Sequence, residues 1–442
     1  MARSPGQAPQ RSSTPSATTL NQSLRQEYPV KNEKTYIVGV GITPFAKQIE
    51  RSVKDLVREA VSAALKDAGC DSSALQAAYF ATAGQGAIEG QFMVSGQIAL
   101  GAMGIMGIPV TNVENACASS STALNAARLH VASGAADICL AVGVDKLFSV
   151  DKERSFAVFD GAWDVHAAEQ QMRHLMSLST DVQPPKGYVE PGKRSVFMDI
   201  YASLARLHMK TFGTTQRQLA AVAAKNHVHS TRNPLAQFQY PLTIDEVLSA
   251  RAVSWPLTLP MCAPISDGAA AAIVCNEDGL RRLQRGRAVE ILASVMRSAT
   301  DRRADQYDRH LCHLAANEAY ESAGLGPRDM SLAEVHDATA FAEIQQTEAL
   351  GFCAFGEGGV MAETGATTLG GQIPINVSGG LLSRGHPIGA TGLAQVFEMV
   401  TQLRHEAGPR QVENARFAIA ENGGGFSGVE EATTCITILG RP

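Results

Sequence analysis

The sequence lacks the features of nucleic-acid-binding and membrane-spanning proteins. Its 442 residues include 38 Lys and Arg against 43 Asp and Glu, giving a formal net charge of −5, so there is no basic excess to attract nucleic acid. No apolar stretch is long enough to span a membrane, because Gly, Asp or Pro interrupts each candidate. With 45% hydrophobic and 18% charged residues, the chain has the composition of a soluble enzyme with one large or two medium cores.

Metal-ligand spacing and a disulfide framework are also missing. Eight cysteines are scattered along the chain, and several lie in apolar runs such as Ile138-Cys139-Leu140, as reduced core residues do. His227 and His229 have no carboxylate or cysteine at ligand spacing, so we interpret them as packing or loop-ordering residues. We therefore predict no metal site, a reducing compartment and a cytoplasmic protein.

Acidic residues are absent before Glu27. Ser, Pro, Thr, Gln and Arg dominate residues 1–34, a composition that cannot bury enough surface to fold, so we predict a disordered tail. The same segment has the Arg- and Ser-rich, acid-poor composition of an organelle transit peptide. It shows no amphipathic apolar face, which favours a plain tail over organelle import.

What is present is one strand–helix pattern used twice. The first half alternates apolar strands with helices, over residues 36–41, 53–68, 77–82, 125–132 and 137–144. The second half repeats this order over residues 289–295, 312–323, 333–337, 390–403, 417–420 and 433–439. The alternation predicts an α/β fold of two duplicated halves, residues 35–285 and 286–442. Residues 148–262 break the pattern, and we interpret them as an inserted loop subdomain that covers the substrate and contains a helix over 197–212.

Cys117 lies in a sharp turn between a strand and the alanine-rich helix of the first half. Free N–H groups at a helix start favour negative charge, so this position predicts a thiol that loses its proton easily. A thiolate is the nucleophile of acyl transfer. The alternative is that Cys117 is one more small buried hydrophobe, as most free cysteines are.

His386 occupies the matching turn of the second half. Gly385 before it and Pro387 after it fix the local backbone, which distinguishes His386 from an ordinary structural histidine. A pseudo-twofold axis between duplicated halves would bring both turns to one central site. We therefore expect Cys117 and His386 to lie together.

Several segments resemble the thiolase superfamily. They are the segment around Cys117, Ser266 to Ala272, His336-Asp337, Asn376 to Gly392 and the glycine loop 423–425, which together span residues 35 to 442 in order. Lys225-Asn226-His227-Val228-His229-Ser230 is most similar to the sterol-carrier-protein-2 type and to archaeal-type acetyl-CoA acetyltransferases. The resemblance implies a duplicated five-layer αβαβα fold and an acyl-CoA C-acyltransferase. Such an enzyme cleaves or forms a 3-oxoacyl-CoA, with coenzyme A as substrate and no bound cofactor.

The resemblance also implies roles for individual residues. Cys117 matches the acyl-accepting nucleophile, His386 the histidine that activates it, and His336 the histidine that holds a thioester oxygen. The N–H groups of Cys117 and Gly424 would form an oxyanion hole, and substrate would be bound by Ser266, Asn376 and Gly385. Relatives are homodimers or tetramers, here with a sheet edge expected near 81–90, and archaeal-type members can use a small zinc-ribbon, OB-fold partner.

One departure from the family is a missing second cysteine. Where relatives carry it, this chain has Glu421 and Ala338, so the α-proton would move to His386, His336, Glu421 or water. Glu421 is thus a candidate base, since a buried carboxyl can acquire a raised pKa. A decarboxylative condensing enzyme and a side-chain-cleaving aldolase stay open as alternatives, although the aldolases lack the nucleophilic cysteine. A non-catalytic acyl-CoA- or lipid-binding subunit is the third alternative.

Overall fold

The computed structural model describes Met1, Ala2 and residues 33–441, apart from 190, 193 and 284. The predicted disordered tail, 1–34, therefore falls almost entirely outside the described residues. Contacts within the chain separate Met1–Asn32 from Glu33–Pro442, and the description below concerns the second unit alone. None of its described helices is long and apolar enough to cross a membrane.

The strands of the two halves have the same spatial order. In the first half the order is β3 (Val110–Val113), β2 (Ala77–Ala81), β4 (Ile138–Lys146), β7 (Asp267–Cys275) and β1 (Tyr36–Ile42). In the second half it is β9 (Leu332–Glu334), β10 (Phe417–Gly424), β11 (Thr433–Gly440) and β8 (Val289–Ser298), and Ile375 bridges to Ala333 beyond β9 in the place of β3. This correspondence confirms the predicted duplication.

The two half-sheets meet at their equivalent strands, β1 and β8. Only two residue pairs join them, Tyr36 with Glu290 and Ile37 with Val289. The two half-sheets are thus joined at a short seam into one nine-stranded sheet. The seam lies where a pseudo-twofold axis relates one half to the other.

Helices and sheets alternate in five layers, because three separate core clusters lie between them. The helix α2 (Val53–Ala68) covers the outer face of the first half-sheet and α12 (Leu311–Ala323) that of the second. Between the half-sheets lie α5 (Ser119–Ala132) and α15 (Thr391–Leu403), whose side chains belong to one shared core. The helix α2 is amphipathic, with a capping box at Ser52, whereas α15 is buried on nearly all sides, as expected for a central layer.

Small residues let the two central helices approach at their N-termini. A Cβ atom on Gly392 would lie 1.9 Å from the Ser121 hydroxyl oxygen, so this position accepts only glycine. Each helix is preceded by a single 3₁₀ turn, Ala116–Ala118 before α5 and Ile388–Ala390 before α15. The close approach brings the residues of both turns to the centre of the molecule.

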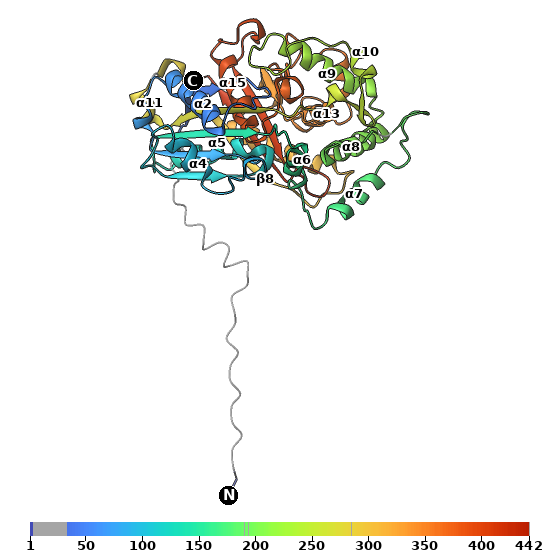
Figure 1. Cartoon of the computed structure of the whole chain (residues 1–442), viewed down its shortest axis with the longest axis horizontal. Coiled ribbons are helices and arrows are strands. Elements are labelled where there is room, and N and C mark those ends of the chain that lie inside the picture. The colour runs from blue at the N-terminus through green and yellow to red at the C-terminus, as the bar shows by residue number, and fades with distance from the viewer. Residues whose placement is uncertain (3–32, 190, 193, 284, 442) are drawn as a thin grey trace. The chain divides into compact units, whose positions relative to one another are not determined.

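The segment between β4 and β7 is mainly helical. It holds α6 (Lys152–Asp160), α7 (Ala168–Ser177), α8 (Val196–Phe212), α9 (Gln216–Ser230), α10 (Ile244–Ser249), and the short strands β5 (Ala252–Ser254) and β6 (Leu257–Thr258). The predicted helix over 197–212 is α8. These elements share a core with α13 (Ala340–Ala349) of the second half, and Figure 1 shows α8, α9, α10 and α13 at the end away from α2 and α11. The segment therefore packs onto the second half as a body.

Four short helices complete the described fold. They are α3 (Gln85–Glu89), α4 (Ser95–Gly101), α11 (Glu277–Arg282) and α14 (Gly358–Glu363). A π-type turn, Gly380–Arg384, follows Gly379 and leads toward His386. The segment Ala81 to Gly90, expected at the sheet edge, instead begins inside the sheet, because β2 pairs with both β3 and β4. The edge strand is β3.

Candidate active site

Cys117 lies on a strained turn at the start of α5. The preceding residue, Ala116, has φ +47°, a left-handed conformation that costs a non-glycine residue about 1–3 kcal/mol. Asn115 holds the turn: its N–H donates to the Ser119 hydroxyl at 2.9 Å, and its side-chain amide donates to the Thr122 hydroxyl at 2.9 Å. The turn conformation and these hydrogen bonds hold the Cys117 side chain at the N-terminal end of α5.

His386 is oriented through both its backbone and its ring. Its N–H donates to the Ser266 hydroxyl at 2.9 Å, and its Nδ1 lies 2.6 Å from Oγ1 of Thr391. The Thr391 hydroxyl donates its own proton to the Pro387 carbonyl at 3.0 Å. Oγ1 must therefore accept from Nδ1–H, which places the imidazole proton on Nδ1 and leaves a lone pair on Nε2.

His336 completes the cluster from the end of β9. Sγ of Cys117 and one ring nitrogen from each histidine all lie within 4.8 Å of one another. The two imidazole rings are 5.3 Å apart between centroids and inclined at 67°. Neither ring nitrogen of His336 has a hydrogen-bond partner among the described residues. The structure thus brings together the three residues that the sequence singled out.

The cluster is electrically neutral in its resting state. Burial raises the pKa of the Cys117 thiol to about 12, and the negative charge of Asp145 adds to this, although the residue keeps some exposure. Burial also lowers the pKa of His336 to about 4 and, with His336 and Arg384 nearby, holds the pKa of His386 well below its usual value. The expectation of an easily ionised Cys117 is therefore wrong, because loss of hydration outweighs the N–H groups that face the sulfur.

The backbone N–H groups around the Cys117 sulfur include that of Gly425. The N–H groups that favour the Cys117 thiolate are those of Cys117 itself and of Gly425, one residue after the predicted Gly424. Gly424 is the last residue of β10 and pairs with Thr433. A Cβ on it would lie 2.2 Å from the Asn115 carbonyl oxygen, so its role is to let β10 touch the Cys117 turn.

Glu421 is tied to the protein through both carboxyl oxygens. Oε2 accepts from the N–H of His336 at 3.0 Å, and Oε1 accepts from the Thr434 hydroxyl at 3.1 Å. Burial, with a contribution from the charge of Glu431, raises its pKa to about 8. Glu421 is outside the cluster of Cys117, His336 and His386. The geometry therefore makes it a support of His336 and does not favour it as the α-proton base.

The three residues expected to bind substrate are buried and bonded within the protein. The hydroxyl of Ser266 donates to Gln237 at 2.6 Å and accepts from His386, so it positions the histidine. The side chain of Asn376 donates to Glu343 at 2.8 Å and accepts from the N–H of Val335 at 2.9 Å. Gly385 has φ +112°, and a Cβ there would lie 2.7 Å from the Ser266 hydroxyl oxygen. All three therefore support the residues that form the site.

A buried polar network under the site was not predicted from the sequence. Asp337 accepts from the N–H of Leu381 at 2.7 Å and from the Asn226 side chain at 2.8 Å. Asn226 also donates to Glu343 at 2.9 Å, and Glu343 pairs with Lys225. Lys225 and Asn226 come from α9 of the inserted segment. This segment therefore supports the His336 loop in addition to packing on the second half. The only sequence signal was the Lys225-Asn226 motif itself.

His229 has the loop-ordering role that the sequence predicted. It is buried, its Nδ1 lies 3.0 Å from the Asn376 carbonyl oxygen, and its Nε2 accepts from the N–H of Leu369 at 3.0 Å. Both ring nitrogens are thus used to hold the chain around Asn376. A metal role for the His227 and His229 pair has no support in this geometry.

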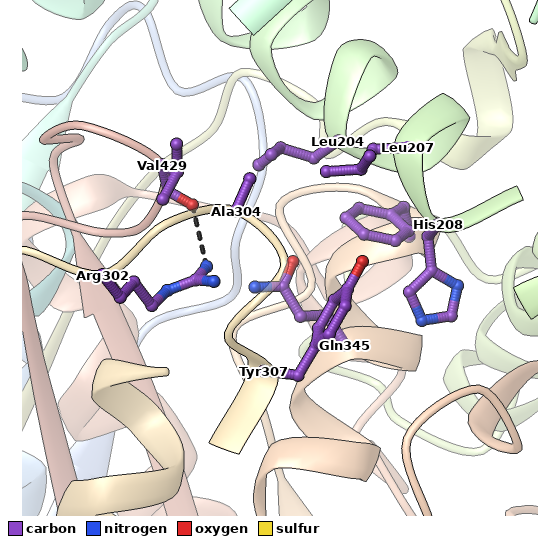
Figure 2. Close-up of a pocket in the computed structure, with 9 residues that line it drawn as sticks. Leu204, Leu207, His208, Arg302, Ala304, Tyr307, Gln345 and Val429 are labelled. Atoms are coloured by element: carbon purple, nitrogen blue, oxygen red, sulfur yellow. Dashed lines mark hydrogen bonds between the residues drawn. The ribbon is translucent and has the colours of Figure 1, made fainter. Parts of the chain in front are cut away.

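A separate pocket lies between α8, α13 and the loop that carries Arg302 (Figure 2). Its volume is about 20 Å³, and it is lined by Leu204, Leu207, His208, Arg302, Ala304, Tyr307, Phe341, Gln345 and Val429. Arg302 donates to the Val429 carbonyl oxygen at 3.0 Å and pairs with Glu430. Its lining includes none of the three clustered residues, so this pocket is distinct from the Cys117 site.

Family models match both halves of the chain. Residues 35–251 match the thiolase N-terminal domain, and residues 293–441 match the thiolase C-terminal domain-like family. The chain belongs to the thiolase family. It is therefore an acyltransferase that uses acyl-CoA thioesters as substrates.

Relatives and solved structures agree with this assignment. The acetyl-CoA acetyltransferase of Methanothermobacter thermautotrophicus is 39% identical, over 92% of this chain and 99% of its own length. The sterol carrier protein 2 of Gallus gallus is 38% identical, over 89% of this chain and 70% of its own. The solved structure of an "Ltp2-ChsH2(DUF35) aldolase" is similar with a TM-score of 0.72 and 25% identity, covering 92% of this chain and 97% of the other. The predicted resemblance is confirmed.

Proposed function

We propose that this thiolase cleaves or forms a 3-oxoacyl-CoA through an acyl-Cys117 intermediate. The observation that supports this role is the neutral cluster of Cys117, His336 and His386, with its reactive atoms within 4.8 Å. A neutral thiol beside a neutral imidazole whose Nε2 carries a lone pair is the resting state that general-base activation of a nucleophile requires. The thiolate then forms only when a substrate carbonyl is present to accept it.

Each half-reaction balances with these residues. Nε2 of His386 takes the thiol proton as Sγ attacks the carbonyl carbon, and the oxygen that becomes negative faces the N–H groups of Cys117 and Gly425. Each such donor is worth about 3–4 kcal/mol at a developing oxyanion. In thiolysis the bond between the α and β carbons breaks, and the acyl group stays on Cys117. The departing acetyl-CoA enolate takes a proton, and coenzyme A then removes the acyl group.

The α-proton step can be assigned by elimination among the described groups. Glu421 is held away by His336 and Thr434, and no second thiol stands in the cluster. After acyl loading, His386 has returned its proton to the leaving thiolate and is again a base. We assign it both proton transfers, and we assign His336, whose ring nitrogens are unpartnered, to donate to the enolate oxygen.

Mass spectrometry of the intact protein tests the intermediate. After incubation with a panel of acyl-CoAs and 3-oxoacyl-CoAs, the wild-type chain should gain the mass of one acyl group. Cys117→Ala should gain none, whereas Cys353→Ala, which removes a partly exposed thiol elsewhere, should be acylated normally. Acylation of the Cys117→Ala protein would rule out the covalent mechanism, and the preferred acyl group would identify the substrate.

Aldol cleavage of a β-hydroxyacyl-CoA is a second candidate, because the similar solved structure is that of a protein named as an aldolase. Such cleavage needs no acyl-enzyme. It is therefore distinguished by the same experiment: product formation from a β-hydroxyacyl-CoA without an acyl adduct would favour it. The presence of Cys117 beside His386 supports the thiolase reaction.

Assembly and location complete the proposal. We propose a homodimer or tetramer, and a small zinc-ribbon, OB-fold partner, which the DUF35 component named in the similar aldolase structure supports. All eight cysteines lie in the described residues and are free, which supports a reducing, cytoplasmic location. We also propose the division into halves 35–285 and 286–442, because β7 is the last strand along the chain in the first half-sheet and β8 is the first in the second.

A further inference from the structure

The side chains of the active site are also a donor set for a metal ion. Among the residues that the structure describes, Cys117, His336 and His386 form the one group of three or more such side chains close enough to hold an ion. A thiolate with two imidazoles suits zinc, whereas magnesium and calcium need oxygen ligands. The sequence alone led us to expect no metal site, and the spatial grouping of these three side chains is the reason to reconsider it.

The spacing requires only a small contraction. Around a tetrahedral zinc with bonds of about 2.0–2.3 Å, neighbouring donor atoms are roughly 3.3–3.7 Å apart. The three donors are within 4.8 Å of one another, so a movement of about 1 Å closes the site. His336 can supply that movement, because no hydrogen bond holds its ring among the described residues.

Two further observations point to a ligand at this place. The imidazole of His336 is only 3% exposed, yet both its nitrogens lack a partner, and a buried polar group without a partner is costly. His386 already has the support that a zinc-bound histidine needs. Its Nδ1–H is held by Thr391 at 2.6 Å, which fixes the direction of the Nε2 lone pair.

We propose that one Zn²⁺ ion binds reversibly to Cys117, His336 and His386 and inhibits the enzyme. The thiol releases its proton to solvent as the zinc–sulfur bond forms, no redox change occurs, and water takes the fourth position. Binding occupies the sulfur and the Nε2 lone pair together. The inhibitory half rests on the proposed function, whereas binding itself does not.

Binding can be measured without any turnover. Equilibrium dialysis of the reduced protein should give one Zn²⁺ per chain, and Co²⁺ in its place should show the charge-transfer absorption of a thiolate ligand. Cys117→Ala should abolish that absorption, and Thr391→Val should weaken binding by roughly 10–100-fold. Cys353→Ala is the matched control and should bind as the wild type does. Unchanged binding by Cys117→Ala, or loss of binding by Cys353→Ala, would overturn the site.

Alkylation of the wild-type chain gives a test that needs no variant. Zn²⁺ should protect Cys117 from iodoacetamide, as read from the mass of its peptide, and a chelator should restore alkylation and acyl transfer together. Undiminished alkylation in the presence of zinc would overturn the site. Protection with undiminished acyl transfer would instead overturn the inhibitory half, and with it the assignment of Cys117 as nucleophile.

Discussion

At the scale of single residues, the site depends on neutral groups that burial holds together. Cys117 is a neutral thiol and His386 a neutral imidazole. Which ring nitrogen of His386 carries the proton therefore decides whether a lone pair faces the sulfur. The protein fixes that direction through Thr391, which itself donates to the Pro387 carbonyl. Thr391 is therefore a positioning residue for the reaction.

Replacing Thr391 by Val should slow acyl transfer while leaving the fold intact. Valine keeps the volume but removes the acceptor for Nδ1–H, so the imidazole loses its fixed tautomer and orientation. We expect kcat/KM to fall by about 10–100-fold, and the rate of Cys117 acylation to fall with it. Thr391→Ser restores the hydroxyl and should recover most of the rate. Equal losses in both variants would remove the tautomer argument.

Glu421 allows a prediction about stability, with a clear sign. Its pKa is about 8 in the folded chain against 4.5 for the unperturbed group, so the folded state holds the proton more tightly. Its contribution to stability is complete below pH 4.5 and is lost as pH rises through about 8. The free energy of unfolding should therefore decline over this range, by an amount on the order of several kcal/mol.

Glu421→Gln should flatten this decline, because an amide of the same shape cannot ionise. Urea unfolding near pH 5.5 and about pH 8.5 measures it, and the slope left in the variant should come from other buried carboxyl groups, among them Glu334 and Glu431, whose pKa values burial raises to about 7. The same variant should still exchange the α-protons of acetyl-CoA, since His386 is the assigned base. Loss of exchange with normal acyl loading would restore Glu421 as the base.

At the scale of helices and strands, the sequence predicted the regular elements closely. The helix expected over 53–68 is α2, and that expected over 312–323 is α12 with one more residue at its start. Both helices end at a glycine, and α2 also has an apolar stripe and a serine cap. The paired turns of Cys117 and His386 were also predictable, because duplication places them by symmetry.

The parts that could not be predicted depend on distant residues. The low pKa expected for Cys117 failed because the sequence shows a helix start but not the burial or the charge of Asp145 that opposes it. Gly425 could not be told from Gly424, since the choice rests on which glycine packs against Asn115. The roles of the polar residues of α9 could not be read from the sequence, because their partners, Asp337, Glu343 and the Asn376 carbonyl, are more than 100 residues away along the chain.

Gly424→Ala tests the contact between β10 and the Cys117 turn. A methyl group there would meet the Asn115 carbonyl oxygen at 2.2 Å and the N–H nitrogen of Ala118 at 2.8 Å, so the turn must shift. Acylation of Cys117 should fall by about 10²-fold, the scale of losing one oxyanion donor. Gly161→Ala, whose new methyl would have no neighbour closer than 3.8 Å, should be nearly silent. Normal acylation in Gly424→Ala would show that the turn tolerates displacement.

At the scale of the whole molecule, one edge of the sheet is left open and apolar. The strand β3 ends the first half-sheet, so one side of its backbone has no partner strand among the described residues. Phe92, Met93 and Met106, which are 77%, 76% and 73% exposed, lie on the segments beside it. The N–H of Gly96 donates to the Asn112 side chain at 2.7 Å, which fixes α4 against this edge.

A second copy of the chain would cover this surface, and we predict that it does. Single exposed apolar side chains are common on monomers, but large contiguous apolar patches are rare, and a stable interface buries about 800 Å² on each partner. Phe92→Glu combined with Met93→Glu should place charge in the centre of the contact and convert the dimer to a monomer. Light scattering at micromolar concentration measures the mass directly. Val150→Glu, at a position 93% exposed on a different segment, adds the same charge away from the edge and should leave the assembly unchanged. If the wild type were already monomeric, or if the double variant stayed dimeric, the β3 edge would not be the interface, and the apolar side chains beside it would need another partner.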